Sequence, residues 1–207
     1  MLPTDSSQSE PGAPSPAPQR THRLHIACVA SVWIVGIVFG VRQLQHFEGT
    51  PGAIGPTPAE WPAGSDVVRD ARLMTLVMLI HPQCSCTQAS LTELAEVMER
   101  AGGRVSAWVL FVQPQNAPHS ASWHEAAHLP GVHVGLDPNG VQAARFGALT
   151  SGYVVLYDVA GRLRFSGGIT AARGHAGKNM GRNQLVAMLD DTTLPPQRHA
   201  VFGCPLG

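Results

Sequence analysis

Residues 73–100 have the sequence LMTLVMLIHPQCSCTQASLTELAEVMER, in which an apolar run, a loop with two cysteines and an amphipathic segment follow one another. The run Leu73–Ile80 ends before Pro82 and predicts a strand that is buried on both faces. In Thr87–Arg100 the apolar residues recur at helical spacing, and Gly102 and Gly103 are expected to end that helix. This stretch therefore predicts a strand, a two-cysteine loop and a helix in direct succession.

The following sequence extends this unit into an α/β domain. Val105–Val112 is a second apolar run, and a strand, a helix and a strand within about 40 residues predict a βαβ unit with parallel strands. Further elements are expected at 121–129 (helix), 131–136 (strand), 139–146 (helix), 153–157 (strand), 163–165 (strand of a hairpin) and 184–189 (helix). This order predicts a three-layer α/β/α sandwich with a mixed sheet over residues 71–207.

The N-terminal region predicts a membrane anchor. Residues 1–19 are rich in Pro, Ser and Ala, so we expect a disordered tail up to residue 23. Residues 24–41 are apolar except for His25, and a helix of this length spans about 27 Å, close to a hydrocarbon core of about 30 Å. Two alternatives are a cleaved signal peptide and a buried core helix. The run is longer than a usual signal-peptide core of about 7–15 residues, and VRQLQHFEG lacks a cleavage site of small residues.

The charges beside this run predict its orientation. Arg20 and Arg23 precede it and Arg42 follows it, which favours a signal-anchor with the N-terminus in the cytoplasm and the rest of the chain outside. Residues 42–70 are expected to be a linker to the domain, with Trp61 at the membrane interface or on the domain edge. The net charge of zero gives no indication of a nucleic-acid partner.

The four cysteines do not form the framework of a small disulfide-rich domain, because only Cys84 and Cys86 are close in sequence. Cys28 lies in the apolar run and is expected to pack there as a small hydrophobic residue. Cys204, near the C-terminus, leaves three readings open: it resolves a mixed disulfide, pairs with a partner, or is a buried free thiol.

The loop His81-Pro82-Gln83-Cys84-Ser85-Cys86 carries the candidate chemistry. A cysteine at a helix N-terminus lies near unpaired N–H groups and the positive end of the helix dipole, which favour the thiolate. His81 is expected to tune this loop and Pro82 to shape its turn. A Cys84–Cys86 disulfide encloses one residue and gains only about 1–2 kcal/mol from loop closure, so a redox role is favoured over a structural one.

Three segments carry a resemblance to a known family: HPQCSCTQASLTEL, TSGYVVLYD and SGGITAARGHAGKNMG. With the strand order above, they resemble the thioredoxin-like superfamily, in particular membrane-anchored bacterial redoxins of the TlpA/ResA type, and within these the proteins labelled RedB. The resemblance covers roughly residues 60–205. It implies a thioredoxin-like fold, a redox-active disulfide, and a place in the bacterial inner membrane with the domain in the periplasm.

The chain departs from the pattern of this family at two places. The family usually carries Cys-x-x-Cys, whereas this chain has Cys84-Ser85-Cys86, so the attacking cysteine does not follow from the resemblance. In the segment Thr150-Ser151-Gly152, which the resemblance implies to face the substrate, Gly152 stands where the family has a cis-proline. The missing proline could leave room for a metal at the cysteine pair.

Two other readings compete with thiol–disulfide exchange. Cys84 and Cys86, with His81 and His175, form a thiolate and imidazole set that suits copper(I) or another soft metal. A non-catalytic binding module is the second alternative. For exchange we expect no cofactor beyond a Cys84–Cys86 disulfide, a protein dithiol or disulfide as substrate, and a transmembrane electron donor or acceptor as partner.

Three remaining motifs predict little chemistry. His124-Glu125-x-x-His128 matches a zinc-protease pattern, but its helix is short and a third ligand is missing at a recognised spacing, so a solvated face is expected. Gly174–Lys178 lacks phosphate-loop spacing and is expected to be an irregular loop over the edge of the site. Asp137 is expected to be a turn or cap residue.

Overall fold

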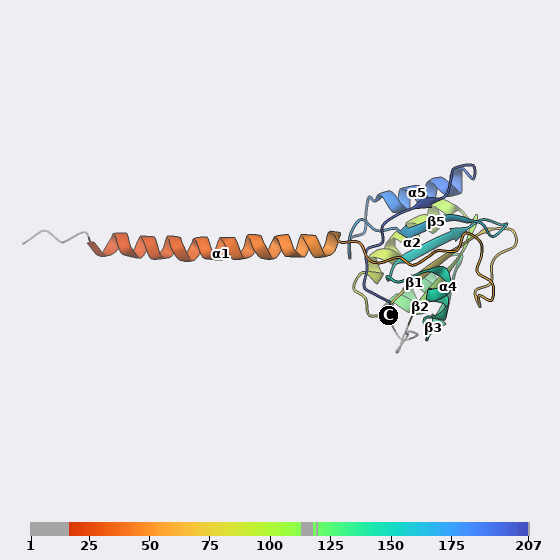
Figure 1. The fold of residues 1–207 in the computed structure, drawn as a ribbon, viewed down its shortest axis with the longest axis horizontal. Helices are drawn as coiled ribbons and strands as arrows, with labels where there is room; N and C mark the ends of the chain where they lie inside the picture. Colours follow the sequence, from red (N-terminus) through yellow and green to blue (C-terminus); the bar gives the residue numbers. More distant parts are fainter. Residues whose placement is uncertain (1–16, 113–117, 119, 207) are drawn as a thin grey trace, which may run out of the picture. The chain divides into compact units, whose positions relative to one another are not determined.

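The computed structural model describes residues 17–112, 118 and 120–206. Its first element is helix α1, Ala17–Gly49, which contains the predicted anchor and continues beyond it at both ends (Figure 1). Residues 17–23, expected in the disordered tail, are helical because adding a residue to an existing helix is far easier than starting one. The rest of that tail lies outside the described residues.

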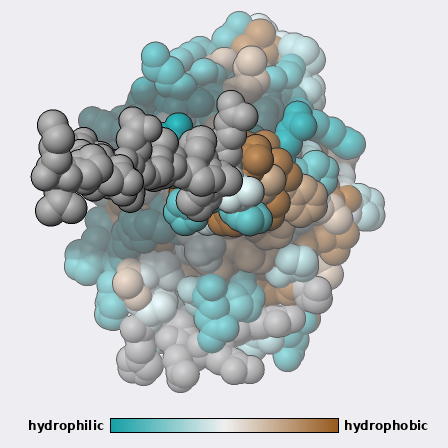
Figure 2. All heavy atoms as spheres, turned by 90° about the vertical axis from the view of Figure 1, so that its left-hand side faces the viewer, coloured by the Kyte–Doolittle hydropathy of each residue, from teal (hydrophilic) through white to brown (hydrophobic). Residues whose placement is uncertain are grey.

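Helix α1 is long and apolar enough to cross a membrane. Its stretch Thr21–Gly49 has a mean hydropathy of 2.3 over the most apolar window, and none of that window is buried in the protein. Cys28 is exposed on this helix, and the helix also exposes large apolar side chains such as Trp33 and Phe39. Figure 2 shows hydrophobic surface, in brown, near the centre and toward the right of the visible face, with a smaller brown area at its top.

The chain from Gln45 onward forms a second compact unit around one mixed sheet. The strands are β1 (Met74–Ile80), β2 (Val105–Val112), β3 (Val132–Asp137), β4 (Tyr153–Tyr157), β5 (Leu163–Gly168) and β6 (Gln197–Arg198). Their order is β3-β2-β1-β4-β5-β6. Strand β1 is parallel to β2 and antiparallel to β4, so the strand that leads into the cysteine loop lies at the centre of the sheet.

Helices cover both faces of the sheet. They are α2 (Thr87–Ala101), α3 (Ala121–His128), α4 (Val141–Phe146) and α5 (Met180–Asp190). Alternate residues of β1 point to opposite faces: Leu76 and Met78 join the core under α2, α3 and α5, whereas Val77 and Leu79 join the core under α4. The predicted three-layer sandwich with a mixed sheet is confirmed, and the predicted elements occur with ends shifted by a few residues (Figure 1).

Much of the segment predicted as a linker packs on the domain. Ile54 and Glu60 form isolated bridges with Ala148 and Arg162. Trp61 stands edge-on to Phe146, with ring centroids 5.3 Å apart, and joins the core under α4. Local sequence patterns do not predict such packing, because the partners of this segment lie about 90 residues further along the chain.

Candidate functional site

The loop between β1 and α2 brings the two neighbouring cysteines to the start of the helix. Cys86 is the N-cap residue of α2, and its side chain makes no capping hydrogen bond. The N–H of Cys84 donates to the His81 carbonyl over 3.1 Å, and the N–H of Thr87 donates to the Cys84 carbonyl over 3.0 Å. These turns fold the loop tightly, and both cysteines are buried, with 7% and 5% of their surface exposed.

Cys204 joins these two cysteines from the other end of the domain. Its Sγ lies 2.8 Å from the Sγ of Cys84, although the two residues are 120 positions apart in the sequence. The three sulfur atoms all lie within 4.8 Å of one another. All three are free thiols.

Backbone hydrogen bonds seat the C-terminal segment, Gly203–Leu206, beside residues 149–151. The N–H of Ser151 donates to the Cys204 carbonyl over 2.8 Å, and the N–H of Leu206 donates to the Leu149 carbonyl over 3.0 Å. Thr150 and Pro205 form an antiparallel bridge between these contacts. The Oγ of Ser151 also accepts the N–H of His81 over 2.9 Å, so one residue contacts both the cysteine loop and the C-terminal segment.

The three thiols differ in pKa because hydrogen bonds stabilise the charged form of Cys84, and that charge disfavours ionisation of the other two. Burial raises the pKa of Cys84, but hydrogen bonds from the Cys204 thiol, from the backbone N–H groups of Cys86 and Cys204 and from the Cys86 thiol outweigh it, so this pKa is lowered. Burial and the neighbouring Cys84 charge raise the pKa of Cys86. Burial, the hydrogen bond to Cys84 and the Cys84 charge raise the pKa of Cys204 to about 12. Cys84 is therefore the most acidic of the three thiols.

The loop before α5 contacts the same cluster. The backbone N–H of Gly174 hydrogen-bonds to the Cys86 thiol, and the charge of Arg173 favours the thiolate form of Cys204. The Arg173 guanidinium donates to the Gly203 carbonyl and lies 4.8 Å from the centre of the Phe47 ring. The glycine-rich loop thus lies over the edge of the site, as predicted.

Gly152 occupies a backbone conformation that proline cannot adopt. Its φ is +87°, in the left-handed region, whereas the ring of proline fixes φ near −65°. Its N–H donates to the Leu79 carbonyl over 2.9 Å, a bond that proline would remove. A Cβ at this position would meet the Oγ of Ser90 at 2.8 Å. Glycine is required here because the backbone has a positive φ and because Ser90 of α2 leaves no room for a Cβ.

The predicted histidines lie outside the three-sulfur cluster. The Nδ1 of His81 accepts the N–H of Gln83 over 3.2 Å, and Pro82 is half-buried in the same turn. The Nε2 of His175 lies 4.0 Å from the carboxylate of Glu48. Among the described residues, the cluster that could hold a metal consists of Cys84, Cys86 and Cys204. The sequence gives one indication that Cys204 belongs to the site, which is that it is the third cysteine after the predicted anchor.

The H-E-x-x-H motif lies on the exposed side of α3. His124 and His128 are exposed, and the Glu125 carboxylate accepts the Gln88 amide over 2.8 Å. A solvated face of a connecting helix accounts for these residues.

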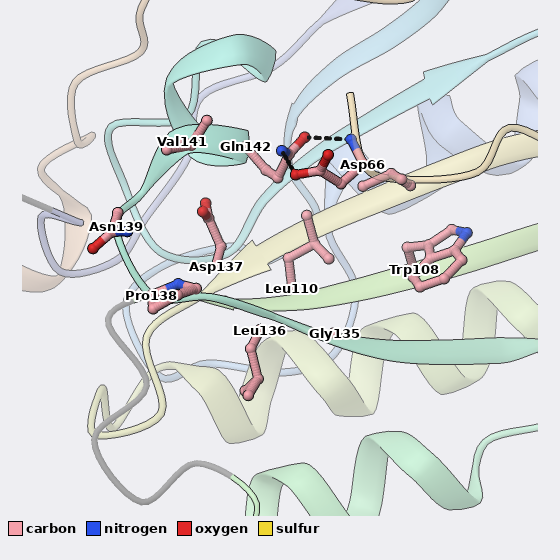
Figure 3. Close-up of a pocket in the computed structure, with 11 residues that line it drawn as sticks. Asp66, Trp108, Leu110, Gly135, Leu136, Asp137, Pro138, Asn139, Val141 and Gln142 are labelled. Atoms are coloured by element: carbon pink, nitrogen blue, oxygen red, sulfur yellow. Dashed lines mark hydrogen bonds between the residues drawn. The ribbon is translucent and has the colours of Figure 1, made fainter. Parts of the chain in front are cut away.

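A cavity of about 280 Å³ lies between β2, β3 and α4, away from the cysteines (Figure 3). The Gln142 amide donates to the Asp66 carboxylate over 2.8 Å, and its carbonyl oxygen accepts the Asp66 N–H over 3.3 Å. Asp137 starts the turn that leads to Gly140, the N-cap of α4, and its carboxylate accepts the N–H of Ala143 in the first turn of that helix over 2.8 Å, as expected of a turn or cap residue. These polar groups stabilise the loop and the helix that line the cavity.

No family model and no curated protein matches this chain. Among solved structures, a hypothetical protein from Sinorhizobium meliloti 1021 is 20% identical, with a TM-score of 0.56 over 77% of this chain and 97% of that one. An uncharacterised conserved protein from Geobacillus kaustophilus is 18% identical, with a TM-score of 0.55 over 76% of this chain and 92% of that one.

Copper-bound ScoI from Bradyrhizobium japonicum is more distant, at 17% identity and a TM-score of 0.43 over 67% of this chain and 98% of that one. Similarity at this level is too low to support a shared activity. The resemblance to proteins labelled RedB stays a prediction.

The strand order decides the fold. The cysteine loop follows the central strand β1, the parallel strand β2 lies on one side of it, and the antiparallel pair β4-β5 lies on the other. The domain therefore has a thioredoxin-like fold.

Proposed function

We propose that this chain is a membrane-anchored thiol–disulfide oxidoreductase in which Cys84 is the attacking thiolate. The observation that carries the proposal is the contact of Cys84 with two further thiols, which lowers its pKa while theirs are raised. A thiolate with a lowered pKa beside protonated thiols combines a nucleophile with the groups that can resolve its product.

The exchange reaction needs no group beyond these sulfurs. The Cys84 thiolate attacks one sulfur of a substrate disulfide, which forms a mixed disulfide and releases the other sulfur as a thiolate. A second protein thiol then attacks the Cys84 sulfur, so the substrate leaves as a dithiol and the protein keeps the disulfide. Two electrons pass from the protein to the substrate, and the reverse sequence oxidises a substrate dithiol.

The proposed location is the bacterial inner membrane, with the domain in the periplasm. Helix α1 is apolar enough for the anchor, and the arginines on its N-terminal side favour the cytoplasm for that end. The electron donor or acceptor would be a transmembrane protein, and the substrate a protein dithiol or disulfide outside the cytoplasm.

A redox titration tests the exchange reaction. The full chain in detergent is preferred to a fragment that starts at residue 60, because such a fragment would lose the contacts of Gly52 and Ile54 with the domain. With Cys28→Ser as background, differential alkylation and mass spectrometry report each cysteine at each potential. We expect one two-electron couple that includes Cys84 and is lost in Cys84→Ser. A protein that forms no disulfide at any potential contradicts the proposal.

Copper(I) binding is the second candidate, and the three-sulfur cluster favours it specifically. Thiolates are the preferred ligands of copper(I), and three of them can be supplied within 4.8 Å of one another. An anaerobic titration with a competing copper(I) chelator should then show one bound ion, with affinity reduced in both Cys84→Ala and Cys204→Ala. Apo protein that leaves copper(I) with the chelator excludes this candidate. If the protein neither exchanges disulfides nor binds copper(I), the remaining hypothesis is a non-catalytic binding module.

A further inference from the structure

The C-terminal segment Gly203–Leu206 is held at the site by contacts along its whole length. Leu206 is 5% exposed and belongs to the core under α4, and the Val201 carbonyl accepts the N–H of Gly52 over 2.8 Å. The backbone of Cys204 pairs with Ser151 over 2.8 Å. The segment therefore delivers its cysteine to Cys84 in a defined orientation.

Gly203 permits the close approach of this segment. A Cβ on Gly203 would lie 1.9 Å from the Ser151 carbonyl oxygen and 3.0 Å from its carbonyl carbon. Both atoms belong to the backbone and cannot rotate away. Any side chain at this position would push the C-terminal segment, and with it the Cys204 sulfur, away from residues 150 and 151.

Cys204 is better placed than Cys86 to form a disulfide with Cys84. The sulfurs of Cys84 and Cys204 are 2.8 Å apart, and they come from two segments that are far apart in the sequence, so no short ring constrains a disulfide between them. A Cys84–Cys86 disulfide would close a ring around Ser85 at the first turn of α2. The Cys86 thiol hydrogen-bonds to Cys84 and is also engaged by the N–H of Gly174 and by the side chain of Ser85.

We propose that Cys204, carried by the C-terminal segment, is the resolving cysteine of Cys84. This inference rests on the proposed exchange function and assigns its second thiol. Cys84 attacks the substrate disulfide, and the first substrate thiolate leaves. Cys204 then gives its proton to a departing substrate sulfur and attacks the Cys84 sulfur, which forms Cys84–Cys204 and releases the second substrate thiol.

The acidities of the two sulfurs fit this order of events. The Cys84 charge is among the causes that raise the pKa of Cys204. That charge disappears once Cys84 is bonded to substrate sulfur, so Cys204 ionises more readily at the moment when its attack is needed. Cys204 stabilises the Cys84 thiolate first and acts as a nucleophile afterwards.

Oxidation of the full chain with glutathione disulfide tests the assignment. In the Cys28→Ser background we expect mass spectrometry to find a Cys84–Cys204 disulfide, and Cys86→Ser should still form it. Cys204→Ser should accumulate glutathione bound to Cys84 and release it at least about tenfold more slowly. Gly203→Ala, which keeps all three thiols, should slow Cys84–Cys204 formation. Gly49→Ala, where a Cβ meets no atom within 4 Å, should not.

The outcomes separate this inference from the proposed function. A Cys84–Cys86 disulfide in the oxidised protein, together with unchanged resolution in Cys204→Ser, overturns the role of Cys204 and leaves the exchange function intact. A protein in which Cys84 takes up no glutathione and forms no disulfide overturns both.

Discussion

At the scale of single residues, Cys84 shows how burial and hydrogen bonding compete. Burial alone would keep this thiol protonated, yet two thiols and two backbone N–H groups point at its sulfur and stabilise the charged form. A helix N-terminus favours a thiolate, but the hydrogen bond that lowers the pKa of Cys84 most comes from Cys204, which is distant in the sequence. The chemistry therefore depends on a contact between residues 120 positions apart.

This acidity predicts a specific pH dependence of alkylation. A lowered pKa means that the Cys84 thiolate is present at lower pH than an ordinary cysteine thiolate, whereas Cys86 and Cys204 stay protonated to higher pH. Iodoacetamide labelling from about pH 5 to about pH 9, read by mass spectrometry, should modify Cys84 first. Cys204→Ala should move the Cys84 profile to higher pH, while Ser85→Ala should leave it in place. Equal profiles for the three cysteines would contradict this assignment.

Gly152 gives a second prediction at this scale. Gly152→Ala should destabilise the domain, because φ at +87° costs a residue with a Cβ about 1–2 kcal/mol and the Cβ would collide with Ser90. Adding Ser90→Ala removes the Oγ contact at 2.8 Å and leaves the nearest Ser90 atom at 3.8 Å, so the double variant should recover part of the loss. Urea unfolding measures both, and an unchanged midpoint in Gly152→Ala would refute the argument.

At the scale of elements, a buried ion pair ties α2 to α5 and to the loop over the site. The Arg182 guanidinium donates to the Glu93 carboxylate over 2.7 Å, and their side chains are 9% and 1% exposed. The same carboxylate accepts the Asn179 amide over 3.0 Å and the N–H of Gly177. Glu93 thus holds the end of the loop whose Gly174 contacts Cys86.

Breaking this pair should be costly. Arg182→Met leaves a buried carboxylate without its cation and should lower the free energy of unfolding by about 3–5 kcal/mol. Arg100→Met is the matched control, because the Arg100–Glu96 pair at 3.5 Å is about half exposed and contributes less than about 0.5 kcal/mol. Urea unfolding of the two variants should differ clearly. Equal midpoints would mean that the buried pair does not stabilise α2 and α5.

At the scale of the whole molecule, one chain combines a helix apolar enough for a membrane with a thioredoxin-like domain. The apolar surface of α1 would be poorly tolerated in water, because large exposed apolar surfaces drive association or membrane binding. A bilayer would provide apolar surroundings for the side chains of this helix.

The proposed orientation predicts which positions can be labelled from outside. In a background with all four cysteines replaced by Ser, Lys178→Cys should react with an impermeant maleimide on intact spheroplasts. His22→Cys, on the N-terminal side of the apolar run, should react only after lysis. The reverse pattern would invert the topology, and labelling of both positions in intact cells would exclude a retained anchor.

The sequence by itself determined the elements and the layers of this protein. Buried strands such as Leu73–Ile80 follow from short apolar runs, the helix Thr87–Arg100 follows from apolar periodicity, and the predicted anchor follows from one apolar run that contains only His25 as an ionisable residue. The sequence also predicts that the loop between this strand and this helix is the site, because two cysteines lie close together just before the helix.

Only the tertiary structure decided which residues meet at that loop. The packing of Trp61, the short strand β6 and above all the arrival of Cys204 beside Cys84 are contacts between distant positions. Local periodicity records which face of an element is buried, but not which distant segment covers it. Which segment covers a given face depends on the order in which the strands assemble beside β1. In this fold that order brings Cys204 to Cys84 and Cys86, so that the pair becomes a cluster of three cysteines.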